Sequence, residues 1–414
     1  MMEAAQYPVE KQYEILMFHY HWITPYLGKA FRVRGNLQWH SVLGVEGLPL
    51  EYSWKWNTAK SRPEIRYTLE AISQLSGTAT DPLNQDASRV LLHKLSEAMP
   101  AVDVSRVYHF LSSLYDHDRS KYCQEAAEGT RLATTTLIAA EFPSTGVTLK
   151  TYFIPRKLGN KGGPVTTEAW GETLRELEPE STGRTQVWDF FKNNPEGKLL
   201  QPFMIAIDNI APEQSRLKLY CRTPRTNFAS IREVMTVGGR ISVSDSQFED
   251  LRTLVAVAVG LDANFSDELE WPLSQQSSNA AVDAFSELPA LQSGLIYYFD
   301  IASGIPQPGV KLYIMVRHYG PDDLILGQAI AGWMERHGRG GFCDAYLSML
   351  QKLSPDSELS GKKGVQVYLS CMFKGSGELE ITSYIAPRGF SPTSGLSPSA
   401  LSIPPRVSLR RRDS

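Results

Sequence analysis

A short alternating stretch, RLKLY at residues 216–220, has side chains suited to chemistry on an anion. Arg216, Lys218 and Tyr220 occupy every second position, and leucines fill the two positions between them. On a strand the three polar residues would share one face. Lysine and arginine form charge-assisted hydrogen bonds with phosphate or diphosphate, and the face of a phenol stabilises a cation. The stretch is therefore either a strand facing solvent or one wall of an anion site.

The same polar-x-Tyr pattern recurs at equivalent places along the chain. Its members are Lys150 and Tyr152, Lys218 and Tyr220, Lys311 and Tyr313, and Gln366 and Tyr368. Arg66 and Lys374 lie on the first and last predicted strand pairs, and Tyr384 lies on the final strand. A solvated strand explains any one triplet, but the repetition favours a single shared site.

The elements that position these residues alternate in pairs, with two helical patterns followed by two strand patterns. This unit occurs five times, and its first copy is incomplete at the helical end. The predicted helices are 10–28, 87–99, 104–117, 168–178, 186–193, 227–235, 246–260, 323–338 and 343–353. The predicted strands are 50–57, 64–72, 134–142, 147–155, 200–208, 216–223, 293–301, 310–317, 365–374 and 379–387.

Paired strands indicate antiparallel hairpins, whereas strands alternating with single helices would indicate a parallel sheet. Five hairpins can close into one barrel of ten antiparallel strands, with the helices packed outside and no sheet edge left exposed. Such a barrel is wide enough to hold a ligand. The predicted fold class is therefore α+β, a single barrel of five ααββ repeats whose polar strand faces point into the lumen.

A lumen that holds both cations and phenols suits one kind of chemistry. The cations would bind a diphosphate, and the aromatic faces would stabilise an electron-poor carbon. Each desolvated cation–π contact is worth about 2 kcal/mol, so several contacts could stabilise a carbocation while the phenols keep water away. Together these groups describe a site that ionises an allylic diphosphate.

Composition limits the other possibilities. The chain has 414 residues and a net charge of -3, which gives no general support for nucleic-acid binding. The stretch MMEAAQYPVEKQYEIL has no apolar signal core, and no apolar run is long enough to span a bilayer. The four cysteines form no CxxC pair, so we expect a cytoplasmic protein with reduced thiols. Residues 1–387 are predicted to form one domain, and the Ser/Pro-rich tail at 388–414 is predicted to be disordered.

Motifs for other chemistries are missing from the sequence. There is no DDxxD or NDxxD metal–diphosphate motif and no HExxH, P-loop or GxSxG sequence. Asp322 and Asp323 are best explained as the start of a helix. His19 and His21 fall on different sides of a helix, which disfavours a metal pair. We therefore expect no metal site and no cofactor.

Five segments, taken as an ordered set, resemble the fungal aromatic prenyltransferases of the dimethylallyltryptophan synthase type. They are GLPLEYSWKWN, IRYTLEAI, LKTYF, RLKLYCRTPRTNFASIREVM and the closing YLSCMFK…ITSY. The resemblance covers the chain from about residue 6 to residue 387. It implies the five-repeat ααββ barrel called the ABBA or PT fold. It also implies metal-independent transfer of a dimethylallyl group from dimethylallyl diphosphate to an aromatic acceptor, usually an indole.

The resemblance also implies roles for individual residues. Glu51 matches the carboxylate that accepts a hydrogen bond from the indole N–H and offsets positive charge in the arenium intermediate. The residues matching the diphosphate-binding cations are Arg66, Lys150, Arg216, Lys218, Lys311 and Lys374. Those matching the tyrosine shield are Tyr152, Tyr220, Tyr313, Tyr368 and Tyr384. From residue type alone, Glu51 is an exposed strand glutamate and each tyrosine is a core residue.

This sequence departs from the tryptophan-specific members at two positions. Pro143 stands where a basic residue is expected, and Ile154 stands where an aromatic residue is expected. Partners for the carboxylate and ammonium of free tryptophan are therefore not found, which favours a larger or less polar indole acceptor. Two alternatives stay open: a phenolic or polycyclic polyketide acceptor, and a non-catalytic barrel that binds small molecules. The chain is expected to act as a monomer or homodimer.

Overall fold

The computed structural model describes residues 1–28, 39, 41, 43, 48–129, 132–157, 165–178, 180–271, 294–302, 304–354 and 359–386. Almost all of the predicted strand residues fall within these ranges. The predicted tail at 388–414 lies outside the described residues, so the domain boundary at 387 stays a prediction.

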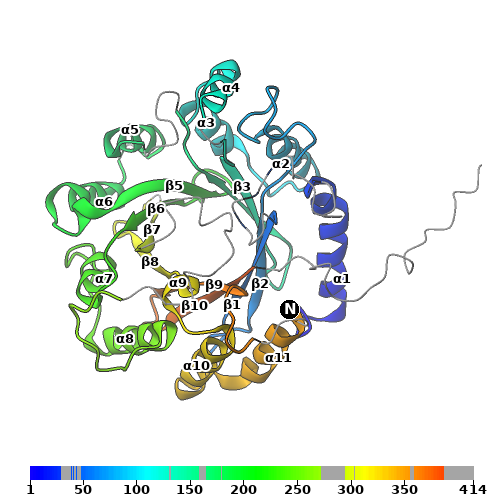
Figure 1. The fold of residues 1–414 in the computed structure, drawn as a ribbon. Coiled ribbons are helices and arrows are strands. Elements are labelled where there is room, and N and C mark those ends of the chain that lie inside the picture. The colour runs from blue at the N-terminus through cyan, green and yellow to red at the C-terminus, as the bar shows by residue number, and fades with distance from the viewer. Residues whose placement is uncertain are drawn as a thin grey trace, which may run out of the picture.

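Ten strands close into one barrel at the centre of the molecule (Figure 1). Neighbours in the sequence pair antiparallel, and β1 (Leu50–Lys55) also pairs with β10 (Leu379–Ile385), which closes the sheet. The other strands are β2 (Glu64–Leu69), β3 (Thr136–Glu141), β4 (Thr148–Phe153), β5 (Gln201–Asp208), β6 (Leu217–Thr223), β7 (Leu295–Ile301), β8 (Gly309–Ile314) and β9 (Gln366–Phe373). The predicted α+β barrel of ααββ repeats is confirmed.

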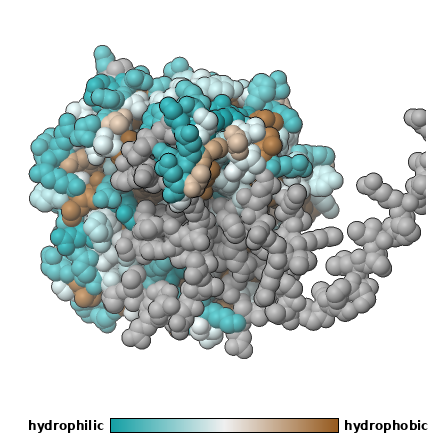
Figure 2. Space-filling model, turned by 45° about the horizontal axis from the view of Figure 1, so that its top comes forward, coloured by the Kyte–Doolittle hydropathy of each residue, from teal (hydrophilic) through white to brown (hydrophobic). Residues whose placement is uncertain are grey.

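Helices surround the barrel, as Figure 1 shows. They are α1 (Val9–Phe18), α2 (Asp86–Ala98), α3 (Ser105–Ser113), α4 (Arg119–Ala127), α5 (Thr167–Leu177), α6 (Thr182–Asn193), α7 (Phe228–Met235), α8 (Asp245–Val259), α9 (Val316–Tyr319), α10 (Asp323–Arg336) and α11 (Cys343–Leu353). In the space-filling view of Figure 2, the coloured part of the surface is mostly hydrophilic with small apolar patches. None of the helices within the described ranges has the length and apolar character needed to cross a membrane.

The two faces of β1 show how the sequence divides core from lumen. Trp54 is fully buried and packs against Tyr346 of α11, with ring centroids 5.5 Å apart. Ser53 points the opposite way, because strand residues alternate between faces, and its Oγ accepts a hydrogen bond from Arg66 Nε at 2.6 Å. Apolar residues on the outer faces thus form the core between sheet and helices, and polar residues on the inner faces line the lumen.

Local signals define where the helices begin. Ser244 caps α8 through a capping box with Gln247, in which each side chain accepts a hydrogen bond from the other residue's backbone N–H. Asp322 caps α10, since its carboxylate accepts a hydrogen bond from the Ile325 N–H at 2.9 Å. The predicted cap in this segment is therefore confirmed.

Three elements differ from the sequence prediction. The helix predicted over 10–28 is α-helical only over Val9–Phe18, and a π-helix (His19–Ile23) and a 3₁₀ helix (Thr24–Tyr26) follow it. Helix α4 was not predicted, because RSKYCQEAA is polar and buries only Tyr122, so it lacks the apolar period that marks a helix. Strand β8 was predicted to continue to residue 317, but it ends at Ile314, and the helical turn α9 follows from Val316. Val316 and Tyr319 are both buried in that turn. A short apolar run does not by itself distinguish a buried helical turn from a buried strand, so the prediction was wrong here.

Candidate active site

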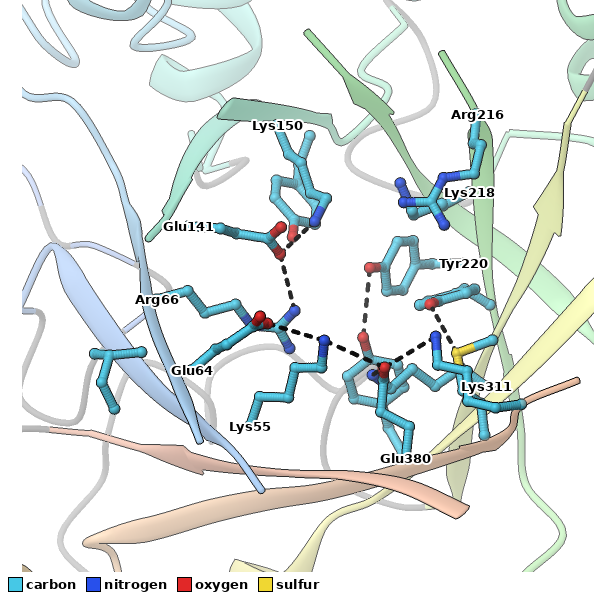
Figure 3. A pocket seen from close by; sticks show the side chains of 16 residues that line it. Lys55, Glu64, Arg66, Glu141, Lys150, Arg216, Lys218, Tyr220, Lys311 and Glu380 are labelled. Atoms are coloured by element: carbon cyan, nitrogen blue, oxygen red, sulfur yellow. Dashed lines mark hydrogen bonds and ion pairs between the residues drawn. The ribbon is translucent and has the colours of Figure 1, made fainter. Parts of the chain in front are cut away.

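A pocket opens at one end of the barrel lumen, and charged side chains surround it (Figure 3). It encloses about 700 Å³, including the part open to solvent. The lining residues are Lys55, Glu64, Ile65, Arg66, Glu141, Lys150, Tyr152, Arg216, Lys218, Tyr220, Tyr298, Lys311, Tyr313, Met372, Lys374 and Glu380.

Most residues singled out from the sequence lie in this lining. The structure brings together Arg66, Lys150, Tyr152, Arg216, Lys218, Tyr220, Lys311, Tyr313 and Lys374. Tyr384 lies directly behind them, where its hydroxyl accepts a short hydrogen bond from Arg66. Tyr368 packs on Tyr384 with ring centroids 6.2 Å apart. Glu51 is not in the lining and lies further along β1.

Cations and phenols occupy different depths of the lumen. Strands β4, β6 and β8 run in the same direction, because every neighbouring pair of strands is antiparallel. On each of these strands a lysine precedes a tyrosine by two residues, or about 6.6 Å along the strand. Arg216, two residues before Lys218, is 41% exposed, whereas Lys218 is 5% exposed. The cations therefore lie toward the open end, and the tyrosines lie deeper.

Asp208, the last residue of β5, gathers three of the cations. Its carboxylate accepts hydrogen bonds from Lys218 Nζ at 2.6 Å and from Arg216 Nε at 2.8 Å. Lys150 Nζ lies 3.9 Å from the same carboxylate. Burial acts to raise the pKa of Asp208, but the three cations outweigh it and hold that pKa below its ordinary value.

Glu380, on β10, gathers a second set of cations. Its carboxylate lies 2.9 Å from Lys374 Nζ and 3.4 Å from the Nζ atoms of Lys55 and Lys311. Glu141, at the end of β3, accepts from Arg66 at 3.1 Å and forms a short ion pair with Lys150. For both glutamates the cations outweigh burial and hold the carboxyl pKa well below its usual range.

The tyrosines form a connected aromatic layer below the charges. Tyr220 contacts its neighbours with ring centroids 5.2 Å from Tyr298, 5.9 Å from Tyr313 and 6.0 Å from Tyr152. Tyr384 continues the layer, with its ring 5.6 Å from Tyr313 and its hydroxyl 3.3 Å from the Tyr313 hydroxyl. Burial raises the phenol pKa of all five above the ordinary value, so these side chains are neutral at physiological pH.

Glu51 lies on the lumenal face of β1, beyond the charged end. It shares that face with Ser53 and Lys55, since alternate strand residues point the same way. Four residues separate it from Lys55, or about 13 Å along the strand. The side chain is 8% exposed, and burial raises its pKa to about 8 despite the opposing effect of Arg66. It is therefore a buried carboxyl group rather than an exposed glutamate.

Sequence reasoning missed several lining residues. They are Lys55, Glu64, Glu141, Tyr298, Met372 and Glu380, together with Asp208 and Asp300 behind them. Glu51 and Lys55 lie on the same face of β1, because side chains alternate along a strand, and this period could have placed Lys55 in the lumen. Tyr298 shares one face of LIYYFDI with Asp300, so this aspartate was the one signal in that strand that could have placed Tyr298 in the lumen. Nothing in the sequence pattern indicates carboxylates in a site that binds an anion.

The arrangement can hold a molecule with an anionic head and an apolar body that develops positive charge. Cations at the open end suit the head, and neutral aromatic faces suit the body. Among the described residues, no group of three or more His, Cys, Asp or Glu side chains is placed to hold a metal ion. Among the described residues, the lining carboxylates Glu64, Glu141 and Glu380 each form an ion pair with a lysine or an arginine instead.

Comparison with known proteins places these features in one family. Residues 1–349 match the family described as tryptophan dimethylallyltransferase. The prenyltransferase anuH of Penicillium roqueforti is 50% identical over 414 residues, which is 100% of this chain and 91% of that protein. Xanthone prenyltransferase A of Emericella nidulans is 44% identical over 398 residues, or 94% of this chain and 89% of that protein.

Solved structures with the same fold are more distant in sequence. AnaPT from Neosartorya fischeri has a TM-score of 0.76 and 22% identity, and the likeness covers 93% of this chain and 90% of that chain. NotF in complex with brevianamide F and DMSPP has a TM-score of 0.72, with the same identity and coverage. At this identity the solved structures show the fold alone. The relatives described above are prenyltransferases, which excludes the alternative that this chain is a non-catalytic binding barrel. The chain belongs to the tryptophan dimethylallyltransferase family and is an aromatic prenyltransferase.

Proposed function

We propose that this chain transfers a dimethylallyl group from dimethylallyl diphosphate to a ring carbon of a small aromatic acceptor. The observation that carries the proposal is the order of side chains along the lumen, with cations at the open end, tyrosines next and Glu51 beyond them. The residues proposed to hold the donor are Arg66, Lys150, Tyr152, Arg216, Lys218, Tyr220, Lys311, Tyr313, Tyr368, Lys374 and Tyr384, joined by Lys55.

The reaction begins when the bond between C1 and the diphosphate oxygen breaks and both electrons leave with the diphosphate. Lysine and arginine neutralise the charge that develops on the leaving group. The tyrosine faces stabilise the allylic cation, at about 2 kcal/mol for each desolvated contact, and they keep water from trapping it. A π bond of the acceptor ring then forms the new bond to the allylic carbon. Loss of a ring proton to the released diphosphate restores aromaticity.

Glu51 is proposed to orient the acceptor by accepting a hydrogen bond from its N–H or O–H. That group becomes more acidic when the ring becomes cationic, so a carboxylate there stabilises the arenium intermediate more than the free acceptor. With a pKa of about 8, the carboxyl group gains this carboxylate form as the pH rises toward and above 8. The position of Glu51 beyond the tyrosines supports this role.

A hydroxylated polycyclic aromatic is the acceptor class that the relatives support best. Two relatives that are 44% and 40% identical to this chain are xanthone prenyltransferases. Pro143 and Ile154 offer no charged partner for an amino acid, which also favours an acceptor without an amino-acid backbone. An O–H group on such a ring can donate to Glu51.

An indole is the second candidate, and it is the acceptor predicted from the sequence. It is supported by the family description, tryptophan dimethylallyltransferase, and by the buried carboxyl of Glu51, which suits an N–H donor as well as an O–H donor.

Incubation with dimethylallyl diphosphate and a panel of acceptors separates the two candidates. The panel contains hydroxyxanthones, simple phenols, indole, cyclic dipeptides and free tryptophan, and mass spectrometry detects the gain of one C₅H₈ unit. We expect hydroxylated polycyclic acceptors to give the most product and free tryptophan the least. Product from indoles alone would favour the second candidate, and no product from any aromatic acceptor would contradict the proposed function.

Activity is expected to survive removal of divalent metal ions. Seven lysine and arginine side chains line the pocket, and they supply the positive charge that Mg²⁺ supplies in other diphosphate sites. The measurement is turnover in excess EDTA compared with turnover in added Mg²⁺. Loss of all activity in EDTA, restored by magnesium, would show that the lysines and arginines alone do not hold the diphosphate.

A further inference from the structure

The pocket proposed to bind a diphosphate is also rich in carboxylates. Glu64, Glu141 and Glu380 line it, and Asp208 and Asp300 lie against its cations. Carboxylates repel a diphosphate, so their presence in its binding site requires a separate reason. The two that contact three cations each, Asp208 and Glu380, point to that reason.

Asp208, on β5, and Glu380, on β10, lie five strands apart around the ten-strand barrel and hold two separate sets of cations. Figure 3 labels one lysine of each set, Lys218 and Lys311. The Asp208 set is Lys150, Arg216 and Lys218. The Glu380 set is Lys55, Lys311 and Lys374. The two sets share no cation, so each carboxylate serves its own side of the pocket.

The most buried member of each set is a lysine. Lys218 is 5% exposed and Lys311 is 2% exposed, whereas Arg216 and Lys374 are more than 40% exposed. Burial lowers the pKa of Lys218 to about 8 and that of Lys311 to about 7. Only a nearby negative charge opposes this loss of protonation, because the other cations of each set act in the same direction as burial.

The charged groups around each lysine come from several strands. Lys218 faces Asp208 of β5, Lys150 of β4, Arg216 just before β6 and Asp300 of β7. Lys311 faces Glu380 of β10, Arg66 of β2 and Lys374, which follows β9. Asp208 contacts Lys218 directly, and Glu380 is the carboxylate that contacts Lys311.

We infer that Asp208 and Glu380 are positioning residues, which keep Lys218 and Lys311 protonated and directed into the pocket before the diphosphate binds. The inference rests on the proposed function, since it takes the lysines to be diphosphate ligands. When the diphosphate arrives, its oxygens become further acceptors for lysines that are already charged and in place. Diphosphate binding then does not carry the free-energy cost of protonating and ordering Lys218 and Lys311.

The test is calorimetric binding of inorganic pyrophosphate to the wild type and to Asp208→Asn at pH 6.5, 7.5 and 8.5. Pyrophosphate ionises over this range, so the ratio of the two dissociation constants is compared at each pH, and the ionisation of the ligand cancels. We expect the variant to bind about tenfold more weakly at pH 8.5 and close to normally at pH 6.5. Loss of Asp208 should lower the pKa of Lys218 by about one unit, so the affinity of the variant should begin to fall at a pH about one unit lower. Glu380→Gln should show the same pattern through Lys311 about one pH unit lower, because the pKa of Lys311 is about 7, so this variant is also measured at pH 5.5. It serves if Asp208→Asn does not fold.

Glu178→Gln is the matched control. Glu178 is a buried carboxylate that binds Arg106 at 2.7 Å between the outer helices, away from the lumen. Its loss should lower the melting temperature without changing the pH dependence of pyrophosphate binding. A constant affinity ratio across the three pH values, or tighter binding by Asp208→Asn, would overturn the inference. Failure of the wild type to bind pyrophosphate would instead contradict the proposed function.

Discussion

At pH 8.5, where Glu51 is mostly ionised because its pKa is about 8, Glu51→Gln is expected to lower kcat by about 10²–10³-fold while leaving binding of the prenyl diphosphate nearly unchanged. Glutamine keeps the shape of the side chain and one acceptor oxygen, but it removes the negative charge. That charge matters most when the acceptor ring has become cationic, so the loss should fall on kcat more than on KM. Steady-state kinetics on the best acceptor from the panel gives both constants.

The pH dependence of kcat provides a second readout of Glu51. Because burial raises its pKa to about 8, the carboxylate form increases as the pH rises toward 8. Wild-type kcat should therefore rise over that range, and Glu51→Gln should lose this rise. An acceptor methylated on its donor N or O cannot donate to Glu51 and should be a poor substrate that is nearly insensitive to the substitution.

Thermal unfolding controls for folding of the Glu51→Gln variant. The carboxyl pKa lies near 8 in the folded protein and at 4.5 in the unfolded chain, so the native state holds a proton that the unfolded state loses. Wild-type stability therefore falls as the pH rises from 4.5 through 8, and the variant should be at least as stable above pH 8. Normal turnover by a folded Glu51→Gln variant would show that Glu51 is not the hydrogen-bond partner of the acceptor.

Lys218→Ala is expected to weaken donor binding by about a hundredfold, and Arg216→Ala by no more than about tenfold. A charged hydrogen bond contributes about 1.5–3 kcal/mol. Lys218 is 5% exposed, so we expect its contribution to lie near the upper limit of that range. Arg216 is 41% exposed, so water screens and partly replaces its contact. The measurement is KM for dimethylallyl diphosphate, together with pyrophosphate affinity.

Acceptor binding distinguishes a specific effect from general damage in these variants. Both substitutions should leave KM for the acceptor within about twofold, since the cations lie about two strand residues toward the open end from the tyrosine layer. Unaltered donor kinetics in both variants would place this face of β6 in bulk solvent. An equal loss for Lys218→Ala and Arg216→Ala would show that burial does not set the strength of these contacts.

The sequence predicted the fold because its repeats are regular. The two-residue period of KTY and KLY assigns Lys150, Lys218 and Lys311 to one face, and closure of the barrel turns that face into the lumen. Helix α4 was missed because a polar helix that buries only Tyr122 lacks the apolar period.

Partners within the site could not be predicted in the same way. Alternation gives the face on which a side chain lies but not what stands opposite it, so the pairing of Asp208 with Lys218 emerges only from the strand register. The raised pKa of Glu51 depends on burial by distant segments, which its neighbours LEYS do not indicate. Tyr298 was missed because its strand is apolar except for Asp300, which shares its face.

The most direct test of the account is a crystal structure of the chain with dimethylallyl thiolodiphosphate, an unreactive analogue of the donor. The account predicts the diphosphate between the Asp208 and Glu380 sets of cations, with oxygens within hydrogen-bonding distance of Lys218 and Lys311. It also predicts the five-carbon tail against Tyr220, Tyr313 and Tyr384, pointing toward Glu51. A diphosphate bound outside the lumen, or a tail that points out of the open end, would contradict the claim that the lumen is the reaction chamber.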